Sequence, residues 1–231
     1  MARAEESSDV RVAPAFLSLM AHELAQPLSA ALGSAYTLKE HASSGVLDSK
    51  TREHLFDTAI RNLEQLQSLL GSLRVFSEAE AGNLQVRRQV VSVDELFADA
   101  EEDFGTPFSK TRVSFKSEPG LQMQVELMLF RQVLTNLINN ADKFSPKGSL
   151  ISIEATKEGL NIVVTVRDEG NGFPPEEAER IFGKSVRLQP GKKGLGVGLF
   201  VAKAIVEAHG GHIRAENTDS GACFSVSVPA A

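Results

Sequence analysis

The sequence predicts an α+β protein made of an antiparallel helical hairpin followed by an α/β sandwich. In about the first 80 residues, apolar side chains recur at steps of three and four, the pattern of helices with one apolar stripe. Beyond residues 81–83 the pattern changes to short β-like runs that alternate with helices. The segment 42–49 between the two helical stretches is short, small and polar, so the helices are expected to fold back on each other.

The two helices are predicted at 16–39 and 55–76. Their stripes consist of Leu17, Met20, Leu24, Leu28, Ala31, Ala35 and Leu38 in the first helix and Phe56, Ala59, Leu63, Leu66, Leu70 and Leu73 in the second. One hairpin exposes its stripe and cannot form a core alone, whereas two copies complete a four-helix bundle. The sequence therefore predicts a homodimer. The alternative is that the hairpin packs on the rest of its own chain.

The second part of the chain alternates strands and helices. Strands are expected at 84–91, 112–116, 122–125, 150–155, 160–167, 212–216 and 222–228, and helices at 127–144 and 197–209. Gly210 and Gly211 are expected to cap the last helix at its C-terminal end. The predicted domains are therefore 1–82 for the hairpin and 83–231 for a sandwich of ordinary single-domain size.

The composition excludes several classes of protein. The hydrophobic fraction of 42% is ordinary for a folded domain and excludes a disordered chain. The formal net charge of −6 indicates no nucleic-acid partner. The single cysteine, Cys223, excludes an intrachain disulfide and a cysteine-rich metal site. No apolar run approaches the roughly 18 residues that cross a bilayer. We expect no membrane segment within these residues and a cytoplasmic location, even if the parent protein is membrane-anchored elsewhere.

One histidine of the first helix lies opposite the apolar stripe. At roughly 100° per residue, His22 is expected to face solvent, with Gln26 one turn later on the same face. Glu23 flanks the histidine, and a neighbouring carboxylate can accept the ring proton and leave one imidazole nitrogen as a nucleophile. Pro27 is expected to kink the helix just beyond. Since most surface histidines carry no chemistry, a plain solvated histidine is the alternative interpretation.

The helix at 127–144 carries a row of polar side chains near its end. Asn136 and Asn140 are one turn apart and share a face. Amide oxygens are hard, neutral ligands that suit Mg²⁺ already carrying phosphates. Lys143 lies on the same face, within reach of a phosphate, and Phe144 is placed to stack on a base. An amphipathic helix that is merely rich in asparagine is the alternative.

The segment 167–174 follows an apolar strand and combines a carboxylate with glycines. Asp168 at the strand end can accept a hydrogen bond from an exocyclic amine, and Gly170 and Gly172 allow a ligand to approach the backbone closely. An ordinary turn would have the same composition.

A glycine-rich loop at 191–199 runs into the next helix. Its backbone amides and the helix N-terminus form an anion site that suits a triphosphate. The spacing of Gly194, Gly196 and Gly198 is neither that of a Walker A loop nor that of a dinucleotide fingerprint.

The string from His22 to Leu28 resembles the H-box of the sensor histidine kinases. That resemblance implies that His22 is phosphorylated and that Glu23 helps to deprotonate it. It also implies that Gln26 assists dephosphorylation of the partner, although the family more often has Thr or Asn at this position.

The later motifs, in their order, resemble the ATP-binding domain that histidine kinases share with gyrases, heat-shock chaperones and mismatch-repair ATPases. The resemblance to the family spans residues 16–229. It implies an ATP site formed by Asn136, Asn140, Lys143, Phe144, Asp168, Gly170, Gly172, Arg187, Gly194, Gly196 and Gly198. In that site Asn140 would hold Mg²⁺, Lys143 and the loop glycines would bind the phosphates, and Asp168 would read the adenine amine. Arg187 would reach from the lid toward the γ-phosphate.

The leading hypothesis is an autokinase that uses ATP and Mg²⁺ to phosphorylate His22 and then donates to an aspartate of a response-regulator receiver domain. A clamp-like ATPase is one rival. In the hydrolytic branches of the superfamily a glutamate serves as base where this chain has Asn136, and an amide cannot take a proton from water. The second rival is a scaffold protein whose nucleotide-binding domain is vestigial. The retained Asn140 and Asp168 argue against this rival.

Overall fold

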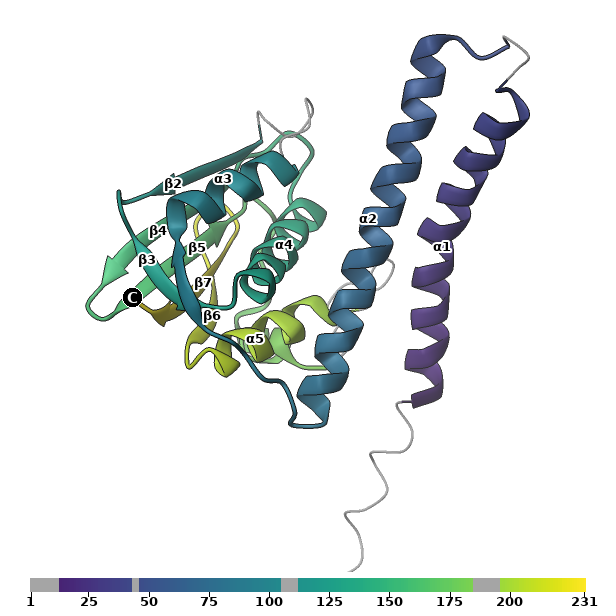
Figure 1. The fold of residues 1–231 in the computed structure, drawn as a ribbon. Helices are drawn as coiled ribbons and strands as arrows, with labels where there is room; N and C mark the ends of the chain where they lie inside the picture. The colour runs from purple at the N-terminus through teal and green to yellow at the C-terminus, as the bar shows by residue number, and fades with distance from the viewer. Residues whose placement is uncertain (1–12, 43–45, 105–111, 185–195) are drawn as a thin grey trace, which may run out of the picture. The chain divides into compact units, whose positions relative to one another are not determined.

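A computed structural model describes residues 13–42, 46–104, 112–184 and 196–231 of the chain (Figure 1). The chain divides into two compact units, with a boundary between Leu73 and Arg74 inside the second helix. The predicted α+β class is confirmed, since two long helices precede an α/β unit. The domain boundary after residue 82 remains a prediction.

The helical hairpin forms most of the first unit, and the end of its second helix, from Arg74, belongs to the second unit. Helix α1 (Ala13–Glu40) and helix α2 (Ser49–Glu80) extend beyond the predicted ranges, α1 mainly at its N-terminal end and α2 by several residues at both ends. Asp48 caps α2, because its carboxylate accepts a hydrogen bond from the Thr51 backbone N–H at 2.6 Å. That bond lowers the pKa of Asp48. Among the described residues, no helix is both long and apolar enough to cross a membrane.

The second unit contains two sheets. A two-stranded antiparallel sheet pairs β1 (Gln89–Ser92) with β3 (Gln122–Val125). A five-stranded sheet has the order β2-β4-β5-β7-β6, and only its β2–β4 pair is parallel. Its strands are β2 (Val113–Ser117), β4 (Ile151–Glu158), β5 (Asn161–Arg167), β6 (His212–Asn217) and β7 (Ala222–Pro229).

Helices cover one face of the five-stranded sheet, as Figure 1 shows for α3 (Val93–Phe104), α4 (Leu127–Phe144) and α5 (Gly198–Ala208). Two short 3-10 helices, η1 (Pro175–Glu177) and η2 (Arg180–Phe182), precede α5. The core lies between the helices and the sheet, where the fully buried side chains include Phe130, Leu137, Ile153, Val164, Val201 and Val226. The α4 bounds match the prediction.

Two details differ from the sequence prediction. The strand predicted at 84–91 is confined to Gln89–Ser92. The preceding backbone is held by a side chain instead of a strand ladder, since the Arg87 N–H donates to the Glu126 carboxylate at 2.7 Å. Helix α3 was not predicted, although its start carries a signal. Ser92 precedes the helix, its hydroxyl accepts a bond from the Glu95 N–H at 3.4 Å, and Ser-x-x-Glu is the capping-box pattern.

The predicted glycine cap of α5 is confirmed. Gly210 has a φ of 74°, its N–H donates to the Glu207 carbonyl at 2.9 Å, and the Gly211 N–H donates to the Val206 carbonyl at 2.9 Å. These two bonds form a Schellman motif, which ends the helix and turns the chain into β6.

Candidate functional site

His22 lies on the exposed side of α1, as its position opposite the stripe predicts. The Nε2 atoms of Gln26 and His22 are 3.1 Å apart. Since the amide nitrogen of Gln26 is a donor, the His22 Nε2 accepts this bond, and the neutral ring then carries its proton on Nδ1. Glu23 is half-buried beside the histidine, and the described residues include no hydrogen bond between the two side chains.

The asparagine face of α4 meets the start of α5. The Asn136 Nδ2 donates to the Gly198 carbonyl at 3.2 Å, and the amide carbon lies 3.7 Å from where a Cβ on Gly198 would sit. Asn140 is half-buried one turn further along α4. At the end of the helix, the Lys143 Nζ lies 5.0 Å from the centre of the Phe144 ring, a cation–π contact. The structure therefore places these four polar or aromatic side chains on the last three turns of α4.

Asp168 lies at the end of β5 with only 4% of its surface exposed. Its Oδ1 accepts two backbone hydrogen bonds, from Gly170 at 2.8 Å and from Ala222 at 3.2 Å. Within the described part of the chain, Oδ2 accepts none. The carboxylate is thus fixed by one oxygen, and the other oxygen remains available to a ligand.

Both predicted glycines of this loop occupy positions that exclude a side chain. A Cβ on Gly170 would lie 2.8 Å from the Phe144 carbonyl oxygen, so this loop closely approaches the end of α4. Gly172 has a φ of 65°, and a Cβ there would collide with the Asn217 side-chain oxygen. The structure therefore brings Asp168 and Gly170 next to Lys143 and Phe144.

The glycine-rich loop is described only in part. Gly196 has a φ of 69°, and Gly198 is the first residue of α5, so both lie where the helix presents its free N–H groups. Arg187 and Gly194 lie outside the described residues. The described residues also contain no cluster of three or more His, Cys, Asp or Glu side chains suited to a metal ion.

Two family models match the chain, one over the range that contains His22 and one over the range that contains the candidate nucleotide residues. Residues 15–82, which include His22, match the His Kinase A (phospho-acceptor) domain. Residues 125–231, which include α4, Asp168 and α5, match the histidine kinase-, DNA gyrase B- and HSP90-like ATPase. The chain belongs to the sensor histidine kinases.

Curated relatives and a solved structure are consistent with this assignment. The kinase is 31% identical over 219 residues to the sensor protein KdpD of Clostridium acetobutylicum, covering 92% of this chain and 24% of the relative. It is 30% identical over 223 residues to the adaptive-response sensory kinase SasA of Thermosynechococcus vestitus, covering 92% of this chain and 59% of the relative. The chain thus spans only part of these relatives. The fold matches the Acinetobacter baumannii histidine kinase AdeS at 23% identity with a TM-score of 0.62, over 90% of this chain and 97% of that one.

The kinase carries site residues that the sequence did not reveal. In the β6–β7 hairpin, the Ala222 N–H binds the Asp168 carboxylate, and a Cβ on Gly221 would collide with the Asp168 carbonyl. The predicted strands at 212–216 and 222–228 imply only a connecting segment at Thr218–Gly221. The hydrogen bond between Ala222 and Asp168 joins positions 54 apart in the sequence, for which no local pattern exists.

Arg112 is a second residue that the sequence did not reveal. Its guanidinium donates to the carbonyls of Ser149 at 3.0 Å and Pro146 at 3.2 Å and forms an ion pair with Asp142. Only 14% of the arginine side chain is exposed. Arg112 therefore fixes the segment that follows α4, next to Lys143 and Phe144 of the kinase.

Proposed function

We propose that the protein binds ATP with Mg²⁺, phosphorylates its own His22 and passes the phosphoryl group to an aspartate of a response-regulator receiver domain. The observation that carries the proposal is the state of His22. It is exposed on the phospho-acceptor helix and its Nε2 accepts a hydrogen bond, so this nitrogen has its lone pair free of a proton.

In the proposed reaction, the His22 Nε2 attacks the γ-phosphorus of ATP. A nitrogen–phosphorus bond forms while the bond to the bridging oxygen of the β-phosphate breaks, and ADP leaves with that electron pair. The Gln26 amide must move off Nε2 before the attack, because the same lone pair forms the new bond. Glu23 is the adjacent carboxylate that would take the Nδ1 proton as the ring becomes positively charged.

The residues of the second unit fit a bound adenine nucleotide. The Asp168 Oδ2 is available to accept the adenine amine, and Gly170, where a Cβ would collide with the Phe144 carbonyl, lets this loop lie close to the end of α4. Lys143 and Phe144 lie together beside that loop. Asn140 is the residue that would hold Mg²⁺, which when bound neutralises charge on the phosphates. Asn136, with its amide nitrogen bound to the Gly198 carbonyl, links that face to the start of α5, where the phosphates would lie.

The test is incubation with γ-³²P-labelled ATP and Mg²⁺, comparing the wild type with His22→Gln. His54→Gln, at another exposed histidine of the hairpin, is the matched control. We expect acid-labile, base-stable label on the wild type and on the control, and none on His22→Gln. Steady phosphate release without protein label would favour the clamp ATPase instead. Transfer is then tested by adding purified receiver domains and following the loss of label from the kinase.

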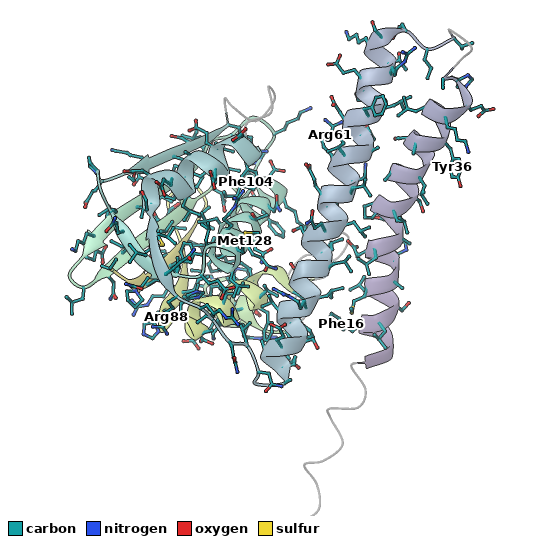
Figure 2. The ribbon with its side chains drawn as sticks, in the orientation of Figure 1. Phe16, Tyr36, Arg61, Arg88, Phe104 and Met128 are labelled. Atoms are coloured by element: carbon teal, nitrogen blue, oxygen red, sulfur yellow. The ribbon has the colours of Figure 1, made fainter. Side chains whose placement is uncertain are left out.

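We also propose that two copies form a four-helix bundle. Several apolar side chains of the hairpin are about half exposed in the single chain, namely Leu28, Leu32, Phe56, Ile60, Leu63 and Leu70. Tyr36 is 66% exposed on α1 (Figure 2). A second hairpin would cover such a surface. Light scattering is expected to give a mass near twice 24.9 kDa.

Two variants test the dimer. Ile60→Glu places a charge on the exposed hairpin surface and is expected to produce monomers. Leu160→Glu changes a residue that is 88% exposed in the β4–β5 turn and should leave the dimer intact. A wild-type chain that is monomeric at micromolar concentration would contradict the bundle. The cytoplasm, where ATP and receiver domains are present, is the proposed location.

A further inference from the structure

Asn217, the last residue of β6, holds the backbone of the loop that carries Asp168. Its Oδ1 accepts a hydrogen bond from the Phe173 N–H at 3.0 Å, and its Nδ2 donates to the Phe173 carbonyl at 2.6 Å. One side-chain amide thus pairs with both backbone groups of one residue 44 positions away. Two parallel bonds fix the orientation of Phe173 as well as its position.

The same loop is fixed at its other end. The Asp168 N–H donates to the Ala222 carbonyl at 2.9 Å, and the Ala222 N–H returns a bond to the Asp168 carboxylate at 3.2 Å. Asn217 and Ala222 lie opposite each other in the β6–β7 pairing, so both ends of the loop are held by one pair of opposed residues. The loop between Asp168 and Phe173 is therefore held at both ends by a single pair of sheet residues.

The side chain of Phe173 adds an apolar contact to the anchor at Asn217. Its ring centre lies 6.4 Å from that of Phe224, which is 2% exposed in β7. A Cβ on Gly172 would collide with the Asn217 side-chain oxygen, so this glycine lies against the amide. A shift of Asn217 would therefore move Gly172 and Phe173 together, and with them Gly170.

We propose that Asn217 is a positioning residue for nucleotide recognition, which sets the Asp168–Phe173 loop against the adenine base through its paired bonds to the Phe173 backbone. The inference rests on the proposed ATP site, and it assigns to Asn217 a share of the preference for adenine over guanine. An amide is required at this position because it offers one donor and one acceptor. A carboxylate of the same size would present a second acceptor to the Phe173 carbonyl and repel it.

The experiment measures the autophosphorylation rate of the whole chain against ATP and GTP concentration for wild type, Asn217→Asp and Asn217→Ala. Asn161→Asp is the matched control, since it adds the same charge at an exposed position at the opposite end of β5. We expect the KM for ATP to rise about tenfold in Asn217→Asp, with kcat at saturating ATP little changed. The ratio of kcat/KM for ATP to that for GTP should fall by a similar factor. Asn161→Asp should match the wild type.

Thermal unfolding without nucleotide separates positioning from folding. If Asn217 had a purely structural role, both Asn217 variants would have a lower melting temperature. The ratio of kcat/KM for ATP to that for GTP would then be unchanged in the protein that remains folded. That result would overturn the inference. An unchanged KM for ATP in Asn217→Asp would overturn it as well. If the wild type itself failed to bind ATP, the proposed function would fail, and the inference with it. ATP binding by the wild type that is insensitive to Asn217 would remove the inference alone.

Discussion

Acidification should destabilise the nucleotide-binding unit through one buried histidine. His209 follows α5 with 0% of its surface exposed. Its Nδ1 lies 2.8 Å from the Ile205 carbonyl oxygen, and its Nε2 accepts a bond from the Glu126 N–H at 2.8 Å. The ring is therefore neutral, with its proton on Nδ1. Burial has the largest effect and lowers the pKa of His209 below 6.5. The hydrogen bond to the Ile205 carbonyl raises this pKa, but by less. The Arg88 guanidinium, labelled in Figure 2, also lowers this pKa, and Glu126 raises it.

The sign and size of the effect follow from proton binding. Below pH 6.5 the unfolded chain binds a proton at this histidine that the folded chain does not. The stabilisation is therefore fully present above pH 6.5 and is lost as the pH falls toward the folded-state pKa. One proton changes the free energy of unfolding by at most about 1.4 kcal/mol per pH unit. Protonation of Nε2 would also break the bond to Glu126, whose backbone begins α4, and an unpaired buried N–H costs about 1–3 kcal/mol.

The assay is urea unfolding followed by circular dichroism at a series of pH values on either side of the ordinary histidine pKa. His209→Gln removes the titrating ring, and His212→Gln, at an exposed histidine, is the control. We expect His209→Gln to be less stable than wild type at neutral pH but to lose less stability on acidification. The control should follow the wild-type slope. If His209→Gln lost stability with acid as steeply as wild type, the role assigned to this histidine would be refuted.

Four further substitutions give testable predictions, three at the nucleotide site and one on α1. Asp168→Asn removes the charged acceptor proposed for the adenine amine and should weaken MgATP binding about tenfold to a hundredfold in calorimetric titration; unchanged affinity would exclude its role. Arg112→Met removes three contacts that fix the segment after α4 and should lower the free energy of unfolding by about 1–3 kcal/mol, whereas a loss near zero would contradict the anchor. Gly221→Ala should cost about 1–3 kcal/mol by overpacking. Gly33→Ala, in open space on α1, should instead stabilise by about 0.5–1 kcal/mol in denaturant unfolding.

Local sequence patterns were sufficient to predict most of the helices and strands. The apolar period places α4 at Leu127–Phe144 because one face of that helix packs continuously against the sheet. Gly210 marks the end of α5 because a left-handed residue is needed to close the helix. Helix α3 was missed because it follows strand β1 directly, with no turn residue between them to separate the two patterns. Its capping box was the local signal that could have revealed it.

The sequence by itself pointed to the residues that are proposed to carry out the chemistry. His22 is exposed because the helical period sets it opposite the stripe, and Asn136 and Asn140 share a face because they are one turn apart. These relations span only a few residues, so they are readable from spacing.

Only the tertiary structure decided how those residues are held. The Asn217 amide meets the Phe173 backbone, and the Ala222 N–H meets Asp168, across separations of 44 and 54 positions. Such contacts depend on strand order and register, since β5 and β6 become close only through their shared neighbour β7. No periodic pattern in the sequence relates these residues to one another, because the sheet pairs strands that are not consecutive in the chain. The sequence therefore names the candidate nucleotide residues, and the fold supplies the contacts that hold them in place.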